Sequence, residues 1–581
     1  MPRDNPNTVR KVTFATTLVA LLGSLVVASQ FNWSTPGEMQ VISKLGWVES
    51  FGLSFSFGID SISLWLILLT TFLMPIVIIG SWTAVDTRVR EFHIWLLVLQ
   101  TAMLGTFVAT DVIFFYICFE FTLIPLFFLI GIWGSTQRLR AAKIFFLYTF
   151  TGSMLTFAGI LYVAYIGATN TGSWSFAMAH IVTAAQGLTP TQQGWVLASL
   201  LAGFAVKVPV WPVHTWLPLA HTEAPTAGSV ILAGVLLKLG TYGILRLAIP
   251  MCPVAVVDAA PIIGTLAVIG ILYTGLICWV QKDIKKLIAY SSVSHLGFCV
   301  LGMFALGRNN IGPTGSVAYM INHGLSTGAL FLCVGMIYER FHTREMRQYS
   351  GMARAMPVWA FFMVFFAMAS VGLPGLNGFV GEFLTLMGTF TNHYTLGPTF
   401  AVFAGAGMII GAIYILYMLG KVVFGSLKIP AHSHDNGDDS HSENLDLNLR
   451  EILTLVPLAI ACLVLGFFPN LILTSLDEPI AKITQQASDY AADQHREKFP
   501  PREGQYTLPA PVTLEQPQGQ APTVIPVVDP VRVLNTVQPG FDLKFSTEKE
   551  NGANKTNQKN DHTNKENNKK DSINKDKDGA S

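Results

Sequence analysis

Long apolar runs, separated by short polar clusters, make up most of the chain as far as residue 475. The runs are roughly 18–25 residues long, and a helix of that length crosses the hydrocarbon core of a bilayer, about 30 Å thick, at 1.5 Å per residue. Because the runs are continuous and do not alternate with a period of two, they predict helices rather than barrel strands. We expect an all-α polytopic membrane protein with about thirteen transmembrane helices, at residues 12–31, 59–82, 93–110, 112–133, 143–166, 194–212, 226–249, 260–280, 287–307, 314–338, 357–391, 398–425 and 451–475.

Two of the expected spans contain breaks. The sixth span contains Pro209 and Pro212, and the eleventh span, residues 357–391, contains Pro374 followed by Gly375. A proline inside a helix lacks the N–H and clashes with the carbonyl four residues back. The breaks lie five spans apart, so we predict two five-helix units, and an odd number of helices inverts the second unit. Inverted repeats with corresponding broken helices are typical of ion transporters, in which the breaks mark the ion site.

The apolar pattern and the breaks together predict the organisation of the chain. N-terminal flanking helices occupy residues 1–92, the first five-helix unit residues 93–249, and the second residues 260–425. A polar loop rich in His and Asp (426–450), a last transmembrane helix (451–475) and a hydrophilic, largely disordered tail (476–581) follow. The tail is rich in Pro and then in Asn, Lys and Asp, a composition that cannot bury a core. A second interpretation, in which the tail binds a partner outside the membrane, stays open.

Positive charges in the short loops predict the orientation of the spans. If the N-terminus is cytoplasmic, nearly all Lys and Arg of the short loops lie inside, and the short outside loops contain only Lys44 and Arg308. This asymmetry is the usual signature of cytoplasmic loops. An odd number of spans then puts the C-terminal tail outside.

Composition excludes several classes of function. The chain is 51% hydrophobic and 13% charged, and its net charge of +1 gives no electrostatic support to nucleic-acid binding. None of its 6 cysteines is arranged in a metal-binding or iron–sulfur spacing. The loop histidines His432, His434 and His441 leave a metal site open, but a solvated loop is the favoured interpretation. No phosphate-binding loop or dinucleotide fingerprint is present, so redox chemistry or ATP hydrolysis would belong to partners.

Ionisable residues inside the predicted spans are the candidate functional groups. Placing a charge at the bilayer centre costs about 2.5–3.5 kcal/mol of free energy, so each such residue is expected to have a structural or functional role. Two structural explanations are available. A static ion pair would explain two of these residues, but not all of them. A lysine that extends its ammonium to the membrane surface would not explain Lys238, which lies in the middle of its span. Burial disfavours the charged form of a group, whereas a nearby opposite charge favours it. A buried lysine whose carboxylate partner moves therefore changes its proton affinity, and a set of such groups predicts a proton path. The candidates are Glu120, Lys207, Lys238, His295, His323 and Glu382.

Four stretches of sequence resemble the antiporter-like subunits of respiratory complex I, NADH:quinone oxidoreductase. They are residues 115–134, 204–243, 283–295 and 322–325, and the resemblance extends over residues 12–475. Within the family the chain is most similar to subunit 4, because a glutamate, Glu382, stands where the sister subunits carry a lysine. The absence of a long lateral helix after the last span, as expected here, points the same way. The family begins with one more helix than we expect in this chain.

The resemblance implies that Glu120 and Lys207 form a coupled pair and that Lys238, His295 and His323 connect toward the second half-channel. From these roles we expect the following mechanism. Lys207 and Lys238 would load protons from the cytoplasm, and Glu120 would form a coupled pair with Lys207 and set its proton affinity. His295 and His323 would relay protons toward Glu382 at the exit.

The resemblance also implies partners and a location. The partners would be other membrane subunits of complex I, including neighbouring antiporter-like subunits, in a bacterial plasma (inner) membrane. FMN, iron–sulfur clusters and quinone would be held by partner subunits, and no cofactor or metal is expected in this chain.

Two other functions remain open at this stage. The chain could be a subunit of a multisubunit sodium/proton antiporter, or the membrane arm of a related hydrogenase or ferredoxin-dependent complex. These proteins share the fold, and the core sequence hardly separates them. Exchange of sodium for protons without a redox donor would favour the antiporter.

Overall fold

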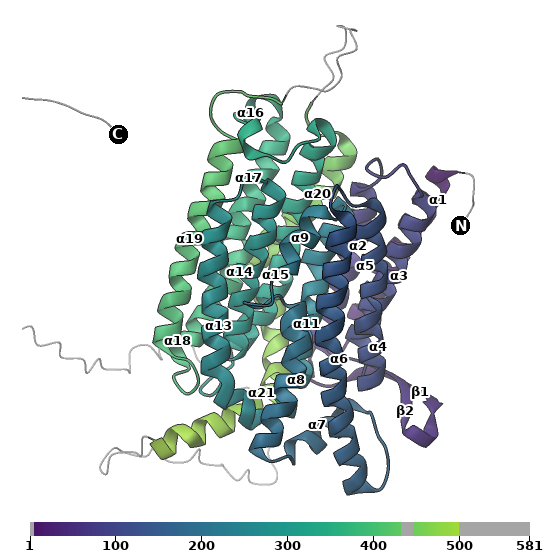
Figure 1. The fold of residues 1–581 in the computed structure, drawn as a ribbon, viewed down its shortest axis with the longest axis vertical. Helices are drawn as coiled ribbons and strands as arrows, with labels where there is room; N and C mark the ends of the chain where they lie inside the picture. The colour runs from purple at the N-terminus through teal and green to yellow at the C-terminus, as the bar shows by residue number, and fades with distance from the viewer. Residues whose placement is uncertain (1–4, 431–444, 499–581) are drawn as a thin grey trace, which may run out of the picture. The chain divides into compact units, whose positions relative to one another are not determined.

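The computed structural model describes residues 5–430 and 445–498, which form helices and one small sheet (Figure 1). The expectation of an all-α membrane bundle is confirmed, with one addition. Strands β1 (Gln40–Val48) and β2 (Leu53–Ile59) form an antiparallel hairpin between the first two transmembrane helices, α1 (Pro6–Gln30) and α2 (Ser61–Gly80).

The first five-helix unit begins at α3 and ends at α12. Its last transmembrane helix runs from Thr226 to Met251 and includes two π-helical segments, Leu232–Leu236 and Ile244–Ala248. The α-helices of this unit are α3 (Val89–Val108), α4 (Val112–Phe121), α5 (Leu123–Trp133), α6 (Arg138–Thr171), α7 (Met178–Gln186), α8 (Pro190–Lys207), α9 (Trp216–Glu223), α10 (Thr226–Ile231), α11 (Leu237–Gly243) and α12 (Ile249–Met251).

The second unit begins at α13, and two further helices follow it. Its helices are α13 (Pro253–Trp279), α14 (Ile284–Met303), α15 (Ile311–Phe341), α16 (Met352–Ala355), α17 (Pro357–Val371), α18 (Asn377–Thr391) and α19 (Pro398–Val422). The last two helices are α20 (Leu449–Phe467) and α21 (Asn470–Lys498).

Eleven helices of the described residues are long and apolar enough to cross a membrane. The other two expected spans are the interrupted ones, as the prolines predicted. Helix α8 ends at Lys207 and resumes as α9 after a series of turns, and the span 357–391 is divided into α17 and α18. In each unit the third helix packs extensively against the fourth: α6 against α8, and α15 against α18. This shared packing supports the predicted repeat.

Polar side chains set where several transmembrane helices begin. Asp60 caps α2 by accepting a hydrogen bond from the Ser63 N–H at 2.9 Å. Asp283 caps α14 in the same way by accepting a hydrogen bond from the Lys286 N–H at 3.1 Å. A capping box of Thr189 and Gln192 starts α8. Such caps satisfy N–H groups that have no partner within the helix.

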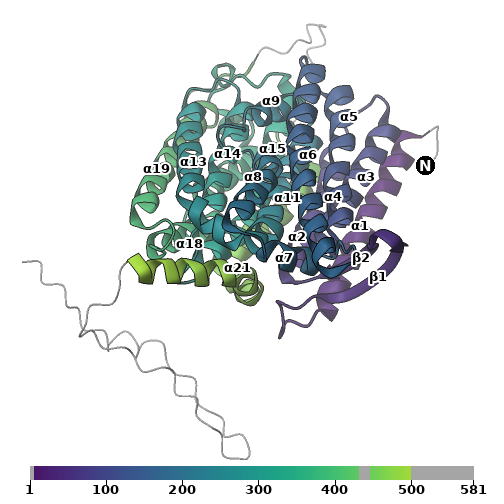
Figure 2. The same cartoon turned by 60° about the horizontal axis from the view of Figure 1, so that its bottom comes forward.

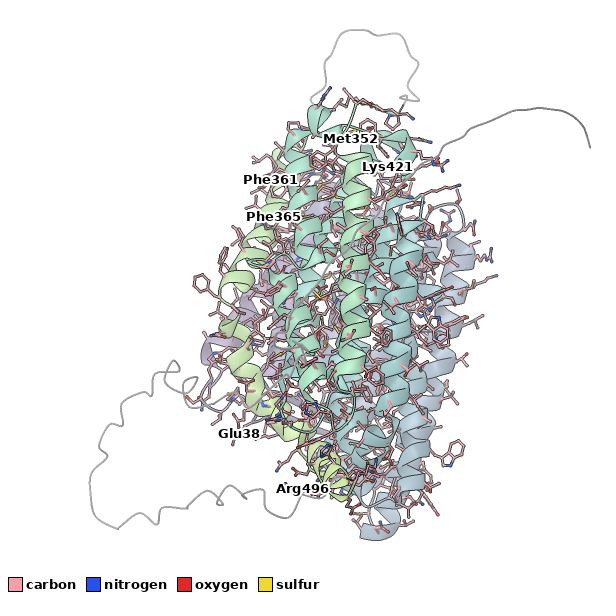
Figure 3. All side chains as sticks on the ribbon, turned by 90° about the vertical axis from the view of Figure 1, so that its left-hand side faces the viewer. Glu38, Met352, Phe361, Phe365, Lys421 and Arg496 are labelled. Atoms are coloured by element: carbon pink, nitrogen blue, oxygen red, sulfur yellow. The ribbon has the colours of Figure 1, made fainter. Side chains whose placement is uncertain are left out.

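Apolar side chains cover the outer surface of the bundle between its two ends. Figure 3 shows Phe361 and Phe365 on the side of the bundle, with Met352 near one end and Glu38 and Arg496 near the other. Phe361 is 63% exposed, as expected of a side chain in contact with lipid. We refer to the two ends as the α16 end and the hairpin end.

The expectation of a disordered tail from residue 476 is wrong for residues 476–498, which belong to α21. This helix crosses the hairpin end of the bundle (Figures 1 and 2) and packs against α2, α12, α13 and α15. Its buried face includes Leu476, Ile480 and Ala487, at helical spacing, while a Lys482–Glu478 ion pair of 2.7 Å lies on the outside and lowers the pKa of Glu478. This helix of 29 residues was not predicted because it is apolar on one face only, and a search for continuous apolar runs passes over such a helix. The tail from residue 499 lies outside the described residues.

Candidate functional site

Lys207 is the last residue of α8 and is buried where the first broken span is interrupted. Its ammonium donates hydrogen bonds to the Phe119 carbonyl at 3.1 Å and to the Thr122 hydroxyl at 3.0 Å, and lies 4.1 Å from the centre of the Phe119 ring. Thr122 sits at the junction of α4 and α5. The lysine therefore joins the break in its own span to a second discontinuity in the glutamate helix.

Glu120 lies on α4, one residue from the carbonyl that Lys207 binds, but the two charges make no direct ion pair among the described contacts. One carboxylate oxygen of Glu120, Oε1, is buried and has no hydrogen-bond partner among the described residues. Glu120 also lines an apolar cleft of about 370 Å³ with Tyr116, Phe146 and other side chains of α4, α5 and α6. The resemblance implies a coupled pair, and the structure places Glu120 and Lys207 as neighbours on α4 and α8, without a hydrogen bond or ion pair between them among the described residues.

Lys238 is completely buried in α11, the short α-helix between the two π-helical segments. Its ammonium lies 2.8 Å from His323 Nδ1 on α15 and donates a second hydrogen bond to the Ala233 carbonyl. π-Helical segments inside α-helices are frequent at functional sites. Helix α11 also packs directly on α8, since a Cβ at Gly240 would lie 3.0 Å from the Lys207 Cβ.

Three further buried groups continue from His323 toward the second broken span. The His323 and His295 rings lie 5.7 Å apart, centre to centre. His295 Nδ1 lies 2.5 Å from the Tyr319 hydroxyl, which donates a hydrogen bond to Glu382 Oε1. His295 Nδ1 is also only 3.4 Å from that carboxylate oxygen. Lys238, His323, His295, Tyr319 and Glu382 therefore form one row of groups that can exchange protons, which we call the buried row.

Glu382 owes its position to the break between α17 and α18. Gly372, which follows α17, has a φ of +83°, and a Cβ at this position would lie 2.4 Å from Glu382 Oε2. Only glycine adopts this backbone conformation readily and leaves the space free for the carboxylate. The Oε2 atom is buried, and residues 5–430 and 445–498 provide no hydrogen-bond partner for it.

A polar cavity of about 170 Å³ opens near the α16 end, beside Lys285, Glu223 and Arg344. Glu223 accepts hydrogen bonds from the Ser135 hydroxyl at 2.7 Å and the Gln137 N–H at 2.8 Å, and Lys285 donates one to the Ala224 carbonyl. Glu223 and Ala224 end the broken sixth span, so the cavity meets α9 at its last residue.

His221 lies on α9, close to this cavity, and is completely buried. It stacks on the Phe331 ring at 4.7 Å, and in the part of the chain that the structure describes neither of its ring nitrogens has a hydrogen-bond partner. Buried nitrogens without hydrogen-bond partners are unusual in proteins. A role of His221 in carrying protons would explain them.

Two family models match the chain over most of its transmembrane part. Residues 109–409 match a model described as "NADH:quinone oxidoreductase/Mrp antiporter, TM", and residues 38–106 match one described as "NADH-ubiquinone oxidoreductase chain 4, amino terminus".

The chain belongs to the NADH:quinone oxidoreductase/Mrp antiporter family.

Family members that resemble the chain include bacterial and plant proteins. It is 43% identical to NADH-quinone oxidoreductase subunit M of Rhodobacter capsulatus, covering 83% of this chain and 91% of that protein. It is 40% identical to NADH-ubiquinone oxidoreductase chain 4 of Arabidopsis thaliana, covering 84% and 93%.

Solved structures of the family share the fold. A chain of respiratory complex I from Thermus thermophilus superposes with a TM-score of 0.71 at 29% identity, covering 82% of this chain and 95% of that one. A chain of the Mrp complex from Dietzia sp. superposes with a TM-score of 0.70 at 21% identity, covering 84% and 94%, which shows the fold alone.

Of the six residues predicted from sequence in this family member, the structure joins Lys238, His323, His295 and Glu382 in the buried row. Lys207 and Glu120 form a second group on α8 and α4. Tyr319 was missed, since tyrosine is common in membrane helices and only its contacts reveal its role. His221, Lys285 and Glu223 were seen only as part of the family resemblance. The loop histidines His432, His434 and His441 lie outside the described residues.

Proposed function

We propose that this family member is the subunit M/chain 4-type membrane subunit of an NADH:quinone oxidoreductase and that it moves protons across the membrane. The observation that carries the proposal is the buried row, in which five proton-exchanging groups from α11, α14, α15 and α18 lie in sequence inside the bundle. A structural ion pair needs two such groups and not five. The closeness of the chain to proteins named subunit M and chain 4 supports the same function.

Protons would enter from the cytoplasm through the cavity beside Glu223 and Lys285. His221, the next titratable group on α9, would accept them and pass them toward Lys238. The described residues include no hydrogen bond between the rings of His323 and His295, whose centres lie 5.7 Å apart, so a water molecule or a ring movement would complete this step. Tyr319 would hand the proton to Glu382, from which it leaves on the outer side.

Glu120 and Lys207 would control this transfer. Movement of the Glu120 carboxylate toward or away from Lys207 changes the stability of a positive charge on the lysine, because the two charges interact at short range in a weakly screening interior. The position of Lys207 against Gly240 on α11 would pass the change to the neighbouring Lys238.

The cleft at Glu120 faces the outside of the bundle, and we propose that a neighbouring antiporter-like subunit covers it. A cation presented by that subunit would stabilise the carboxylate of Glu120, which lines the cleft. FMN, iron–sulfur clusters and quinone would belong to other subunits, whose redox chemistry drives the movement of charge.

The α16 end would face the cytoplasm of a bacterium whose inner membrane holds the complex. Arg354 is part of α16, the Lys428 ammonium binds the Arg347 carbonyl beside α16, and Arg344 lines the cavity near this end, where the positive-inside rule expects such charges. The N-terminus would then be cytoplasmic and the tail outside.

The test is to tag the chain, solubilise membranes gently and assay the purified assembly for NADH-dependent quinone reduction with flavin and iron–sulfur signals. Activity and cofactors that purify with the tagged chain would support the proposal. Purification with small membrane subunits alone, together with sodium-dependent proton exchange in liposomes, would refute it in favour of an antiporter.

A further inference from the structure

A second buried charge cluster lies at the hairpin end of the last helix of the first unit. Arg246, in the π-helical segment Ile244–Ala248, forms an ion pair of 2.5 Å with Asp60, which directly follows β2. The Asp60 side chain is 1% exposed and the Arg246 side chain 11% exposed. None of the proton-transfer steps proposed above uses this pair.

Tyr242 connects the pair to two neighbouring helices. Its hydroxyl accepts a hydrogen bond from Arg246 Nε at 3.3 Å, lies 2.8 Å from the Ser63 hydroxyl of α2, and donates to the Phe107 carbonyl of α3 at 3.3 Å. Arg246 Nη2 also donates to the Ser63 hydroxyl at 3.3 Å. The cluster therefore closes the space between α2, α3 and the last helix of the first unit.

The cluster stands between Lys238 and the hairpin end. Lys238, Tyr242 and Arg246 follow one another at intervals of four residues, which places neighbouring members on the same side of a helix. Eight residues of helix correspond to about 12 Å along the axis. A proton that left Lys238 straight toward the hairpin end, instead of along the buried row, would have to pass this cluster.

We propose that Arg246, Asp60 and Tyr242 form an electrostatic barrier that prevents protons on Lys238 from leaving through the first unit. The barrier directs them sideways along the buried row to Glu382, so that outward release is confined to the second unit. This proposal rests on the proposed function, because it assumes that Lys238 carries protons.

Each member of the cluster is unsuited to passing a proton on. A guanidinium stays protonated in proteins, so Arg246 repels a second positive charge and does not accept a proton. Both carboxylate oxygens of Asp60 are occupied, one by Arg246 and the other by the Ser63 N–H that it caps. The Tyr242 proton is directed at a backbone carbonyl, which accepts a hydrogen bond but cannot relay it. Fixed positive charge of this kind excludes protons and cations in membrane pores.

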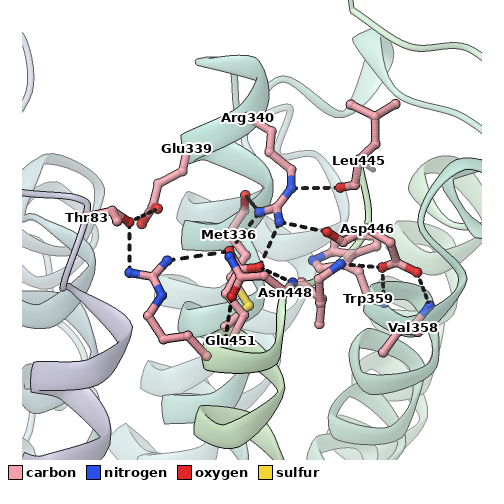
Figure 4. Close-up of polar contacts among 12 residues, drawn as sticks. Thr83, Met336, Glu339, Arg340, Val358, Trp359, Leu445, Asp446, Asn448 and Glu451 are labelled. Carbon is pink, nitrogen blue, oxygen red and sulfur yellow. Dashed lines mark hydrogen bonds and ion pairs between the residues drawn. The ribbon is translucent and has the colours of Figure 1, made fainter. Parts of the chain in front are cut away.

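A matched ion pair at the opposite end of the bundle provides the control. Arg340 on α15 binds both carboxylate oxygens of Glu451 on α20, at 2.9 and 2.7 Å, and also donates to the carbonyls of Leu445 and Asp446 (Figure 4). This pair is buried to a similar degree but lies away from the buried row. Breaking it loosens helix packing without opening a route from Lys238.

The experiment measures how fast a proton gradient decays in liposomes that contain the whole complex, after NADH-driven pumping has been stopped. Arg246→His introduces an imidazole that exchanges protons near neutral pH. Asp60→Asn removes the carboxylate charge and keeps a residue that caps α2 well, so it preserves the helix start. Glu451→Gln is the control, and a native gel checks that each variant is assembled.

We expect the gradient to decay severalfold faster in Arg246→His than in the wild type and in Glu451→Gln. Asp60→Asn leaves the positive charge of Arg246 uncompensated, so its gradient should decay no faster than that of the wild type. Adding Lys238→Met to Arg246→His should return the decay to the wild-type rate, because the leak starts at Lys238. Decay in Arg246→His no faster than in Glu451→Gln, decay in Asp60→Asn as fast as in Arg246→His, or a leak that persists with Lys238→Met would overturn the barrier. Normal pumping in Lys238→Met alone would instead refute the proposed function, so the two failures are distinguishable.

Discussion

Gly372 offers a way to disturb Glu382 without altering any group that exchanges protons. In Gly372→Ala, the new Cβ would lie 2.4 Å from Glu382 Oε2, whereas an ordinary contact begins at 3.4 Å. The carboxylate must therefore move by about 1 Å, and a misplacement of this size costs a reacting group up to about 10²-fold in rate. We expect NADH-driven proton pumping by the second unit to fall by one to two orders of magnitude.

The control for this prediction is Gly375→Ala, three residues further along the same turn. Gly375 also has a positive φ, +92°, so alanine costs about 1–2 kcal/mol of backbone strain at either position. A Cβ at Gly375, however, would meet only the Phe467 ring, at 3.7 Å. The assay is fluorescence quenching by the proton gradient in inverted vesicles, normalised to NADH oxidation. Equal pumping by the two assembled variants would refute the idea that the glycine makes room for Glu382.

Three further predictions concern the buried row, the uptake route and α21. Tyr319→Phe removes the hydroxyl between His295 and Glu382, so the ratio of protons pumped to electrons transferred should fall, and an unchanged ratio would remove Tyr319 from the path. His221→Phe keeps the stack on Phe331 and removes both nitrogens, so pumping should slow while a thermal-shift assay shows an unchanged melting temperature; wild-type pumping would contradict the uptake route. Leu476→Ala on α21 should destabilise the subunit by about 2–5 kcal/mol, because Leu476 is completely buried. A melting temperature equal to that of the wild type would show that α21 is not docked as described.

The breaks and the buried charges could be predicted from the sequence because both are costly in a bilayer. Prolines inside long apolar runs marked the ends of α8 and α17. Lys238 was identified because a charge inside the membrane is energetically costly and is retained mainly for function. Hydropathy also located the transmembrane helices, including those that carry the two histidines. These signals depend on residue type and position along the chain alone.

The features that were missed depend on direction and contact. Whether Glu120 touches Lys207 is decided by where each side chain points, and the lysine turns to a carbonyl and a hydroxyl instead. Tyr319 is identified only by its two hydrogen-bond partners. Helix α21 is apolar on one face, so a search for continuous apolar runs passes over it, and the hairpin at residues 40–59 was overlooked for the same reason.

The most direct test of the account is the number of protons pumped per electron by the purified complex carrying Lys238→Met. Methionine is close to lysine in length, and it removes the charge and the hydrogen bond to His323 at the start of the buried row. The account predicts fewer protons pumped per electron in an assembled complex. A ratio equal to that of the wild type would contradict the claim that the buried row carries protons.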